Sequence, residues 1–192
     1  MNKSKFHSIF PIEILTTFID TKIADSVEKI VTPRLNKLKK GGNVSTDYHE
    51  KTKIITPSEF PDLAKEMGKC LMEYSDNTGA AIGHKIDHWV QDYQIGENHP
   101  RHAHPNSSLS GVYFVRANEH AGVLQLMNPN PHTYFQKYFN ENSNQNLYFD
   151  IKPQKGLLVI FPSYLFHQAL HSENKNCIRT CIAFNVDIYN EK

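Results

Sequence analysis

Three histidines in the second half of the chain have the residue type and spacing of a metal site. His102 and His104 are two residues apart, so on an extended backbone their side chains point to the same side. His167 follows the apolar run 156–161 and the turn at Pro162, and it could complete a three-nitrogen face on one ion. Because imidazole binds iron, zinc, copper and nickel, these residues predict a metal without specifying which one.

The apolar run 178–186, which we expect to be the last strand, has an unusual face. If Arg179 faces inward, then Cys181, Ala183 and Asn185 share its side, and all three are small or polar. A packed sandwich core would fill that face with large apolar side chains, so the pattern indicates an open cavity that contains a guanidinium. A guanidinium binds carboxylates in a bidentate manner. We therefore expect a metal that chelates one end of a small dicarboxylate while Arg179 holds the other end.

These candidate residues need a scaffold, and the composition is that of an ordinary globular domain. The 192 residues are 39% hydrophobic and 21% charged with a net charge of +1, which gives no reason to expect binding to nucleic acid or to a membrane surface. No apolar run approaches the length of a bilayer span, and the N-terminus lacks a signal-peptide core, so we expect a cytoplasmic protein. The three cysteines lack a CxxC arrangement and are expected to be reduced thiols.

The first 82 residues are expected to form a strand and supporting helices. Residues 6–18 predict an opening edge strand, and a helix that begins near Asp20 should break at Pro33. Residues 43–55 predict a loop with a short strand at 53–55. A second helix is predicted from Ser58 or Pro61 to Tyr74, because its apolar residues recur at helical spacing and include Cys70, which should be buried.

Residues 83–192 have a different character and predict a β core. Short apolar runs alternate with turn residues, which is typical of an all-β sandwich or barrel. The chain is therefore expected to be one mostly β domain, 1–192, in which the helices of 1–82 pack outside the β core of 83–192. The runs are 86–90, 112–115, 123–127, 147–151, 157–161 and 178–186.

Several blocks in the stretch 89–187 resemble one known family. HAHPNSSLSGVYFV, LQLMNP, PQKGLLVIFPSYLFH and RTCIAFN are similar in sequence and order to the iron(II)/2-oxoglutarate-dependent oxygenases, specifically a subfamily with HxH in its first metal motif. The resemblance implies a double-stranded β-helix, which is a jelly-roll variant of the cupin-like barrel. It also implies roles for six residues: His102, His104 and His167 as iron ligands, Arg179 as the partner of the distal carboxylate of 2-oxoglutarate, and Tyr113 and Asn185 as further cosubstrate or substrate contacts.

The activity implied by this resemblance is that of a dioxygenase. Such an enzyme uses Fe(II), 2-oxoglutarate and O2, converts 2-oxoglutarate to succinate by oxidative decarboxylation, and hydroxylates an unactivated C–H bond. The chain departs from the wider superfamily at two positions. His104 stands where the common site of two histidines and one carboxylate has its carboxylate, and Cys181 stands where a serine often follows the arginine.

Two alternatives remain open from the sequence. A cupin would share the barrel and the HxH, but the glutamate that its first motif requires is absent, since Ser108 and Leu109 stand there, and a cupin would not need Arg179. A non-catalytic jelly-roll protein could hold zinc inertly in the three histidines, or could hold no metal at all.

The substrate is the part that the sequence specifies least. A small molecule or a peptide is compatible with the chain, homodimerisation is an expectation without a predicted interface, and residues 134–146 are a candidate lid. Among the other histidines, His171 is the competing distal ligand, whereas His99, His120 and His132 are expected to face solvent.

Overall fold

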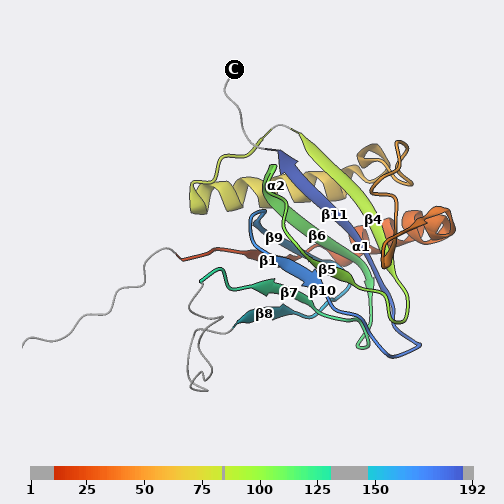
Figure 1. Ribbon diagram of the computed structural model, residues 1–192. Helices are drawn as coiled ribbons and strands as arrows, with labels where there is room; N and C mark the ends of the chain where they lie inside the picture. Colours follow the sequence, from red (N-terminus) through yellow and green to blue (C-terminus); the bar gives the residue numbers. More distant parts are fainter. Residues whose placement is uncertain (1–10, 84, 131–146, 188–192) are drawn as a thin grey trace, which may run out of the picture.

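Two antiparallel sheets face one another, and the helices cover the outer face of the larger sheet (Figure 1). The computed structural model describes residues 11–83, 85–130 and 147–187. The larger sheet has the strand order β1-β9-β6-β11-β4-β3-β2 and the smaller sheet has the order β5-β10-β7-β8. The strands are β1 (Leu15–Phe18), β2 (Lys39–Gly41), β3 (Val44–Thr46), β4 (Ile86–Tyr93), β5 (His99–His102), β6 (Ser107–Ala117), β7 (Leu124–Met127), β8 (Tyr148–Ile151), β9 (Leu157–Pro162), β10 (His167–Ala169) and β11 (Arg179–Asp187).

The mostly β architecture with outer helices is as the sequence predicts. The helices are α1 (Thr21–Val31) and α2 (Pro61–Thr78), with 3-10 segments η1 (Thr32–Lys37) and η2 (Pro57–Glu59). No helix in the described part of the chain is long and apolar enough to cross a membrane. The predicted opening edge strand is present as β1, whereas residues 6–10 of that prediction and the candidate lid 134–146 lie outside the described residues.

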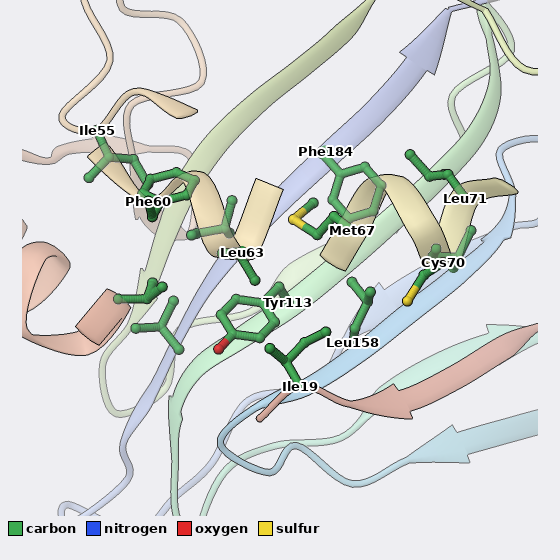
Figure 2. Packing of buried hydrophobic residues seen from close by; sticks show 14 of the residues in the cluster. Ile19, Ile55, Phe60, Leu63, Met67, Cys70, Leu71, Tyr113, Leu158 and Phe184 are labelled. Atoms are coloured by element: carbon green, nitrogen blue, oxygen red, sulfur yellow. The ribbon is translucent and has the colours of Figure 1, made fainter. Parts of the chain in front are cut away.

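Helix α2 packs its predicted stripe on the larger sheet, and Figure 2 shows Met67 beside Phe184 of β11. The helix continues past the expected end at Tyr74 to Thr78, because Gly79 supplies the left-handed residue (φ 73°) that terminates it. Cys70 is buried in this stripe, as predicted. Helix α1 gives way to a 3-10 turn at Pro33, the position where the sequence predicts the break.

The central strands separate two apolar clusters by strict alternation. Along β9, Leu158 and Ile160 face the helices, and Val159 and Phe161 face the smaller sheet. Along β11, Ile182, Phe184 and Val186 face the helices, whereas Cys181 and Ala183 face inward. The predicted parity of this strand is confirmed. Its inward side chains are too small to fill the space between the sheets, so a cavity is left there.

The β2–β3 hairpin corrects the prediction of a loop over residues 43–55. Residues 39–46 form a hairpin around the two-residue turn Gly42-Asn43, with Gly42 at φ 67°, and β3 pairs with β4. Residues 53–55 are not a strand. Buried Asp47 accepts hydrogen bonds from the backbone N–H of Val90 at 2.7 Å and of Ile54 at 2.8 Å, and so ties this segment to the sheet.

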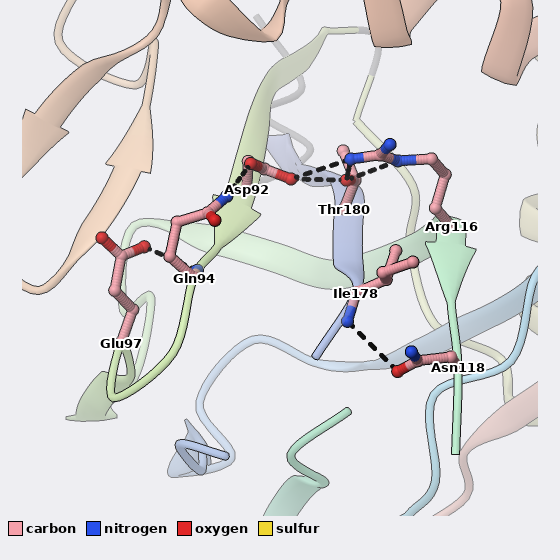
Figure 3. Close-up of polar contacts among 7 residues, drawn as sticks. All are labelled: Asp92, Gln94, Glu97, Arg116, Asn118, Ile178 and Thr180. Carbon is pink, nitrogen blue, oxygen red and sulfur yellow. Dashed lines mark hydrogen bonds and ion pairs between the residues drawn. The ribbon is translucent and has the colours of Figure 1, made fainter. Parts of the chain in front are cut away.

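A polar network on the helix side of the sheet fixes the end of β11 that carries Arg179 (Figure 3). Thr180 Oγ1 donates to Asp92 Oδ1 at 2.5 Å and accepts from Arg116 Nη2 at 3.0 Å. The side-chain amide nitrogen of Gln94, Nε2, donates to Asp92 Oδ2 at 2.6 Å. Because Thr180 is held on one face of the strand, its neighbour Arg179 is directed to the opposite face, into the space between the sheets.

Candidate metal centre and cosubstrate pocket

The three predicted histidines come together between the two sheets. His102 ends β5, and its direct partner on the neighbouring strand is His167, the first residue of β10. His104 lies just past β5, where its backbone N–H donates to the Ser163 carbonyl at 2.8 Å. One nitrogen from each ring lies within 4.8 Å of the other two. The three rings therefore lie together as the sequence predicts and could hold one metal ion, although His104 is placed by a loop and not by a strand.

Backbone carbonyls hold two of these rings in one tautomer. His102 Nδ1 is 2.7 Å from the Pro100 carbonyl oxygen, and His167 Nδ1 is 2.9 Å from the Leu165 carbonyl oxygen. A carbonyl only accepts, so each Nδ1 carries the proton and donates. The Nε2 atoms of both rings are thereby left with a free lone pair, which is the state that a metal requires.

The rings are neutral near pH 7, as metal ligands must be. Burial is the largest cause and the neighbouring His102 the next: the pKa of His167 is lowered to about 3 and the pKa of His104 to about 4. Burial also lowers the pKa of His102. The site can therefore bind a cation without first releasing protons from these side chains.

His99 corrects the expectation of a solvent-facing ring. It stacks on His102 with 4.0 Å between the ring centroids, and its Nδ1 is 3.0 Å from the amide nitrogen of Gln91. Gln91 in turn accepts from the hydroxyl of buried Tyr93 at 3.1 Å. The sequence analysis did not single out Gln91, but the alternation along β4 places Trp89, Gln91 and Tyr93 on the cavity side, and that parity was an available signal.

Arg179 is buried at the other end of the same cavity, as predicted, and is 2% exposed. Its guanidinium carbon lies 4.4 Å from the centroid of the Tyr93 ring, and Nη1 donates to the Gly122 carbonyl at 2.7 Å. Its Nε has no hydrogen-bond partner among the described residues, and no carboxylate of the described chain pairs with it. A buried cation without a counter-charge is unfavourable, so this end of the cavity is suited to an anion.

The cavity that joins the three histidines to Arg179 is narrow, with a volume of about 30 Å³. Its wall includes buried Cys181, which lies two residues after Arg179 on the same face of β11. Burial raises the pKa of this thiol to about 12, so Cys181 is a neutral wall residue at pH 7. The chemistry of its two ends matches a small dicarboxylate, with the three histidines at one end and the guanidinium at the other, and the side chains that line the cavity must move apart to admit one.

The structure separates Tyr113 from this site and corrects its assignment as a cosubstrate contact. Tyr113 is fully buried beneath the helices, in the outer apolar cluster of Figure 2, and it is absent from the lining of the cavity. Strand alternation is the reason: its neighbours Val112 and Phe114 face inward, so Tyr113 faces outward. Asn185 does line the cavity, but its described contacts are with His104 and Ser110.

The remaining histidines lie away from the cluster or outside the description. His171 is exposed beside Glu173, and its Nε2 lies 3.9 Å from that carboxylate. His120 contacts Glu119 in the same way at 3.5 Å. His132 lies outside the described residues. The competing ligand His171 is therefore not part of the group formed by His102, His104 and His167.

A second hollow adjoins the metal centre on the side of the β2–β3 hairpin. It has a volume of about 290 Å³, it is open to solvent, and it shares His102, His104 and Trp89 with the first cavity. Tyr48 packs edge-on against Trp89 with 4.8 Å between the ring centroids. The hollow has no Asp, Glu, Lys or Arg in its lining within the described chain.

Comparisons with known proteins place this fold and site in a family. Residues 87–185, which are more than half of the chain and include all three histidines and Arg179, match the model of the family described as "Putative 2OG-Fe(II) oxygenase". The chain belongs to this family of iron(II)- and 2-oxoglutarate-dependent dioxygenases. Its metal, cosubstrate and oxidant are accordingly Fe(II), 2-oxoglutarate and O2. No curated protein sequence matches the chain at a significant level.

Solved structures of similar fold are remote in sequence. A prolyl-4-hydroxylase from Pseudomonas putida has a TM-score of 0.69 at 12% identity, with 93% of this chain and 94% of that chain covered. A prolyl hydroxylase from Trichoplax adhaerens, solved with a hypoxia-inducible-factor peptide, has a TM-score of 0.60 at 14% identity, with coverage of 92% and 83%. A 2OG-Fe(II) oxygenase family oxidoreductase from Burkholderia pseudomallei has a TM-score of 0.56 at 9% identity, with coverage of 90% and 84%. These likenesses confirm the predicted jelly-roll fold.

Proposed function

We propose that His102, His104 and His167 hold the iron and that Arg179 binds the distal carboxylate of 2-oxoglutarate. The observation that carries this proposal is the single cavity with three neutral nitrogen ligands at one end and a buried, unpaired guanidinium at the other. When bound, iron(II) supplies the dioxygen chemistry, in which 2-oxoglutarate is decarboxylated to succinate.

The protein's own groups contribute charge and orientation to this reaction. Three neutral histidines leave the full charge of the metal in place, whereas the common site with one carboxylate reduces it by one. An anionic cosubstrate therefore meets two cationic groups, and it can be held at both ends. The guanidinium of Arg179 is oriented before binding, because its plane lies against Tyr93 and its Nη1 is bonded to the Gly122 carbonyl.

The substrate, by this proposal, is a small molecule or a peptide that presents a neutral C–H-bearing group through the hollow beside Tyr48. Aromatic side chains and the absence of Asp, Glu, Lys and Arg in its described lining support a neutral group there, since the lining offers no counter-charge to a charged one. Two proteins of similar fold are prolyl hydroxylases, which supports hydroxylation as the reaction. A cytoplasmic location and a homodimer remain predictions from the sequence.

The cosubstrate assignment is tested with a ligand that lacks the distal carboxylate. Anaerobic calorimetry on the iron(II)-loaded protein should show much tighter binding of 2-oxoglutarate than of 2-oxobutanoate. Arg179→Met should remove the preference, since only the distal carboxylate contacts that side chain. Lys155→Met, which removes a surface charge ion-paired with Asp25 and Glu28, is the matched control and should keep the preference. Equal affinities for the two acids in the parent would contradict the proposal.

A further inference from the structure

The ring of His104 differs from the other two ligand rings in what its Nδ1 contacts. His102 and His167 donate to backbone carbonyls, whereas His104 Nδ1 lies 3.2 Å from the amide nitrogen of Asn185. The amide oxygen of Asn185 accepts from the Ser110 hydroxyl at 2.7 Å. The third ligand is therefore the only one of these three whose Nδ1 contacts a side chain.

The register of the larger sheet explains why Asn185 reaches this position. Asn185 on β11 is directly opposite Ser110 on β6, and both line the cavity. Asn185 shares the inward face with Arg179, at the opposite end of the strand. One face of β11 thus presents the cosubstrate-binding cation at its start and a contact to a metal ligand near its end.

The Asn185 amide can face His104 Nδ1 with either its nitrogen or its oxygen, and only one arrangement suits a bound metal. With the amide nitrogen toward the ring, His104 Nδ1 accepts, and the single proton of the neutral ring lies on Nε2. Nε2 is the nitrogen that remains to bind a metal, and it cannot do so while it carries a proton. A half-turn of the Asn185 amide about its terminal bond gives the other arrangement. The amide oxygen then accepts from Nδ1–H, and the amide nitrogen donates to the Ser110 hydroxyl, which can act as donor or acceptor.

We propose that Asn185 is a positioning residue for the metal centre: its amide oxygen accepts from Nδ1–H of His104 and holds the ring in the tautomer whose Nε2 is free. This inference rests on the proposed function, because it requires His104 to be a ligand. Hydrogen bonds from a ligand histidine to a second group orient the ring and raise its basicity. In this chain the group acts on the one ligand that stands in place of the usual carboxylate.

The tautomers can be observed directly by ¹⁵N NMR of the imidazole rings. In the metal-free protein, His102 and His167 should carry their protons on Nδ1, because each donates to a backbone carbonyl. After addition of Zn(II), a diamagnetic probe for the same site, the proton of His104 should lie on Nδ1. A signal of His104 Nδ1–H in the zinc-loaded protein that is unchanged in Asn185→Ala would overturn the proposed hydrogen bond.

Metal affinity tests the positioning role without any turnover. Calorimetry should show that Asn185→Ala binds Co(II) about 10- to 100-fold more weakly than the parent. This is the loss in metal affinity that typically follows removal of a hydrogen-bond partner of a ligand histidine. Asn185→Asp should restore the affinity or exceed it, because a carboxylate accepts from Nδ1–H in its only available arrangement. Ser108→Ala is the matched control, since it removes a hydrogen bond between the same two strands that does not involve a histidine, and it should bind Co(II) like the parent.

Two outcomes separate this inference from the proposed function. If His104→Ala binds Co(II) as tightly as the parent, the proposed ligand set is wrong and the role of Asn185 fails with it. If His104→Ala loses affinity but Asn185→Ala does not, the ligand set stands and only the positioning role is overturned. Urea unfolding of each metal-free variant identifies any loss that is due to misfolding.

Discussion

Replacement of Arg179 by methionine distinguishes a cosubstrate-binding arginine from an ordinary structural one. Methionine has a similar length and no charge, so it fills much of the same space against Tyr93. Removal of one partner from a buried arginine–carboxylate pair typically lowers the free energy of unfolding by about 3–5 kcal/mol. Arg179 has no such carboxylate in the described chain, and its Nε is unsatisfied. The two interpretations therefore predict different stabilities for the metal-free variant.

The magnitude follows from the contacts of the guanidinium. The variant loses the 2.7 Å hydrogen bond to the Gly122 carbonyl, worth about 1.5–3 kcal/mol for a charged donor, and the stacking on Tyr93, worth about 0.5–2 kcal/mol. It also removes the desolvation cost of a buried charge, which is several kcal/mol. These contributions roughly cancel, so the free energy of unfolding of the metal-free variant should change by about 1 kcal/mol or less.

Binding of the cosubstrate should then be lost while the fold is kept. At a ligand concentration of one hundred times Kd, 2-oxoglutarate should stabilise the metal-loaded parent by about 2.7 kcal/mol, and it should stabilise Arg179→Met by much less. Urea unfolding, with Co(II) in place of iron and with or without 2-oxoglutarate, measures both quantities. The reasoning is refuted if the metal-free variant loses more than 3 kcal/mol and 2-oxoglutarate still stabilises it as it does the parent.

Three further predictions concern the metal-free fold, the sheet and the substrate hollow. Burial holds the pKa of His167 at about 3 and that of His104 at about 4, below the ordinary 6.5, so the unfolded chain takes up protons first. Stability should be fully present above pH 6.5 and fall as the pH drops towards 4; a urea midpoint that is equally pH-dependent in His167→Gln would contradict this. Gly111→Ala places a Cβ 2.1 Å from the Phe184 ring and should lower the free energy of unfolding by about 1–3 kcal/mol. Gly68→Ala, which has open space around it in α2, should raise it by about 0.5–1 kcal/mol. Equal effects of the two substitutions would count against the packing described. Tyr48→Ala should reduce the 2-oxoglutarate turnover that a substrate stimulates and leave the substrate-independent turnover unchanged, and the reverse pattern would exclude a substrate role for the hollow.

Local patterns predicted the parts of this site that depend on one strand or one turn. The inward face of Arg179, Cys181, Ala183 and Asn185 follows from alternation alone, and the structure confirms it. The stripe of α2 was predicted for the same reason, since 3.6-residue periodicity is a local property. His102, His104 and His167 were predicted as a group from residue type and spacing, and the structure brings their nitrogens together.

The misses have different physical causes, and only the last depends on pairing between distant segments. Tyr113 was assigned to the cavity from its motif, but its parity relative to Val112 and Phe114 places it under the helices. The strands β2 and β3 have three residues each, too few to show alternation, so only the Gly42-Asn43 turn signalled them. The contact of Asn185 with His104 depends on the β6–β11 register and on the loop after β5, and no local pattern reports either.

The most direct test of the site is an anaerobic titration of the metal-free protein, first with iron(II) and then with 2-oxoglutarate. A 2-oxo acid chelated to iron(II) produces a weak visible charge-transfer band. We expect the band in the parent protein and a weakened band in both His104→Ala and Arg179→Ala, which would assign the metal and cosubstrate ligands together. Binding of iron(II) without a band in the parent would contradict the account and favour a metal-binding barrel without this chemistry.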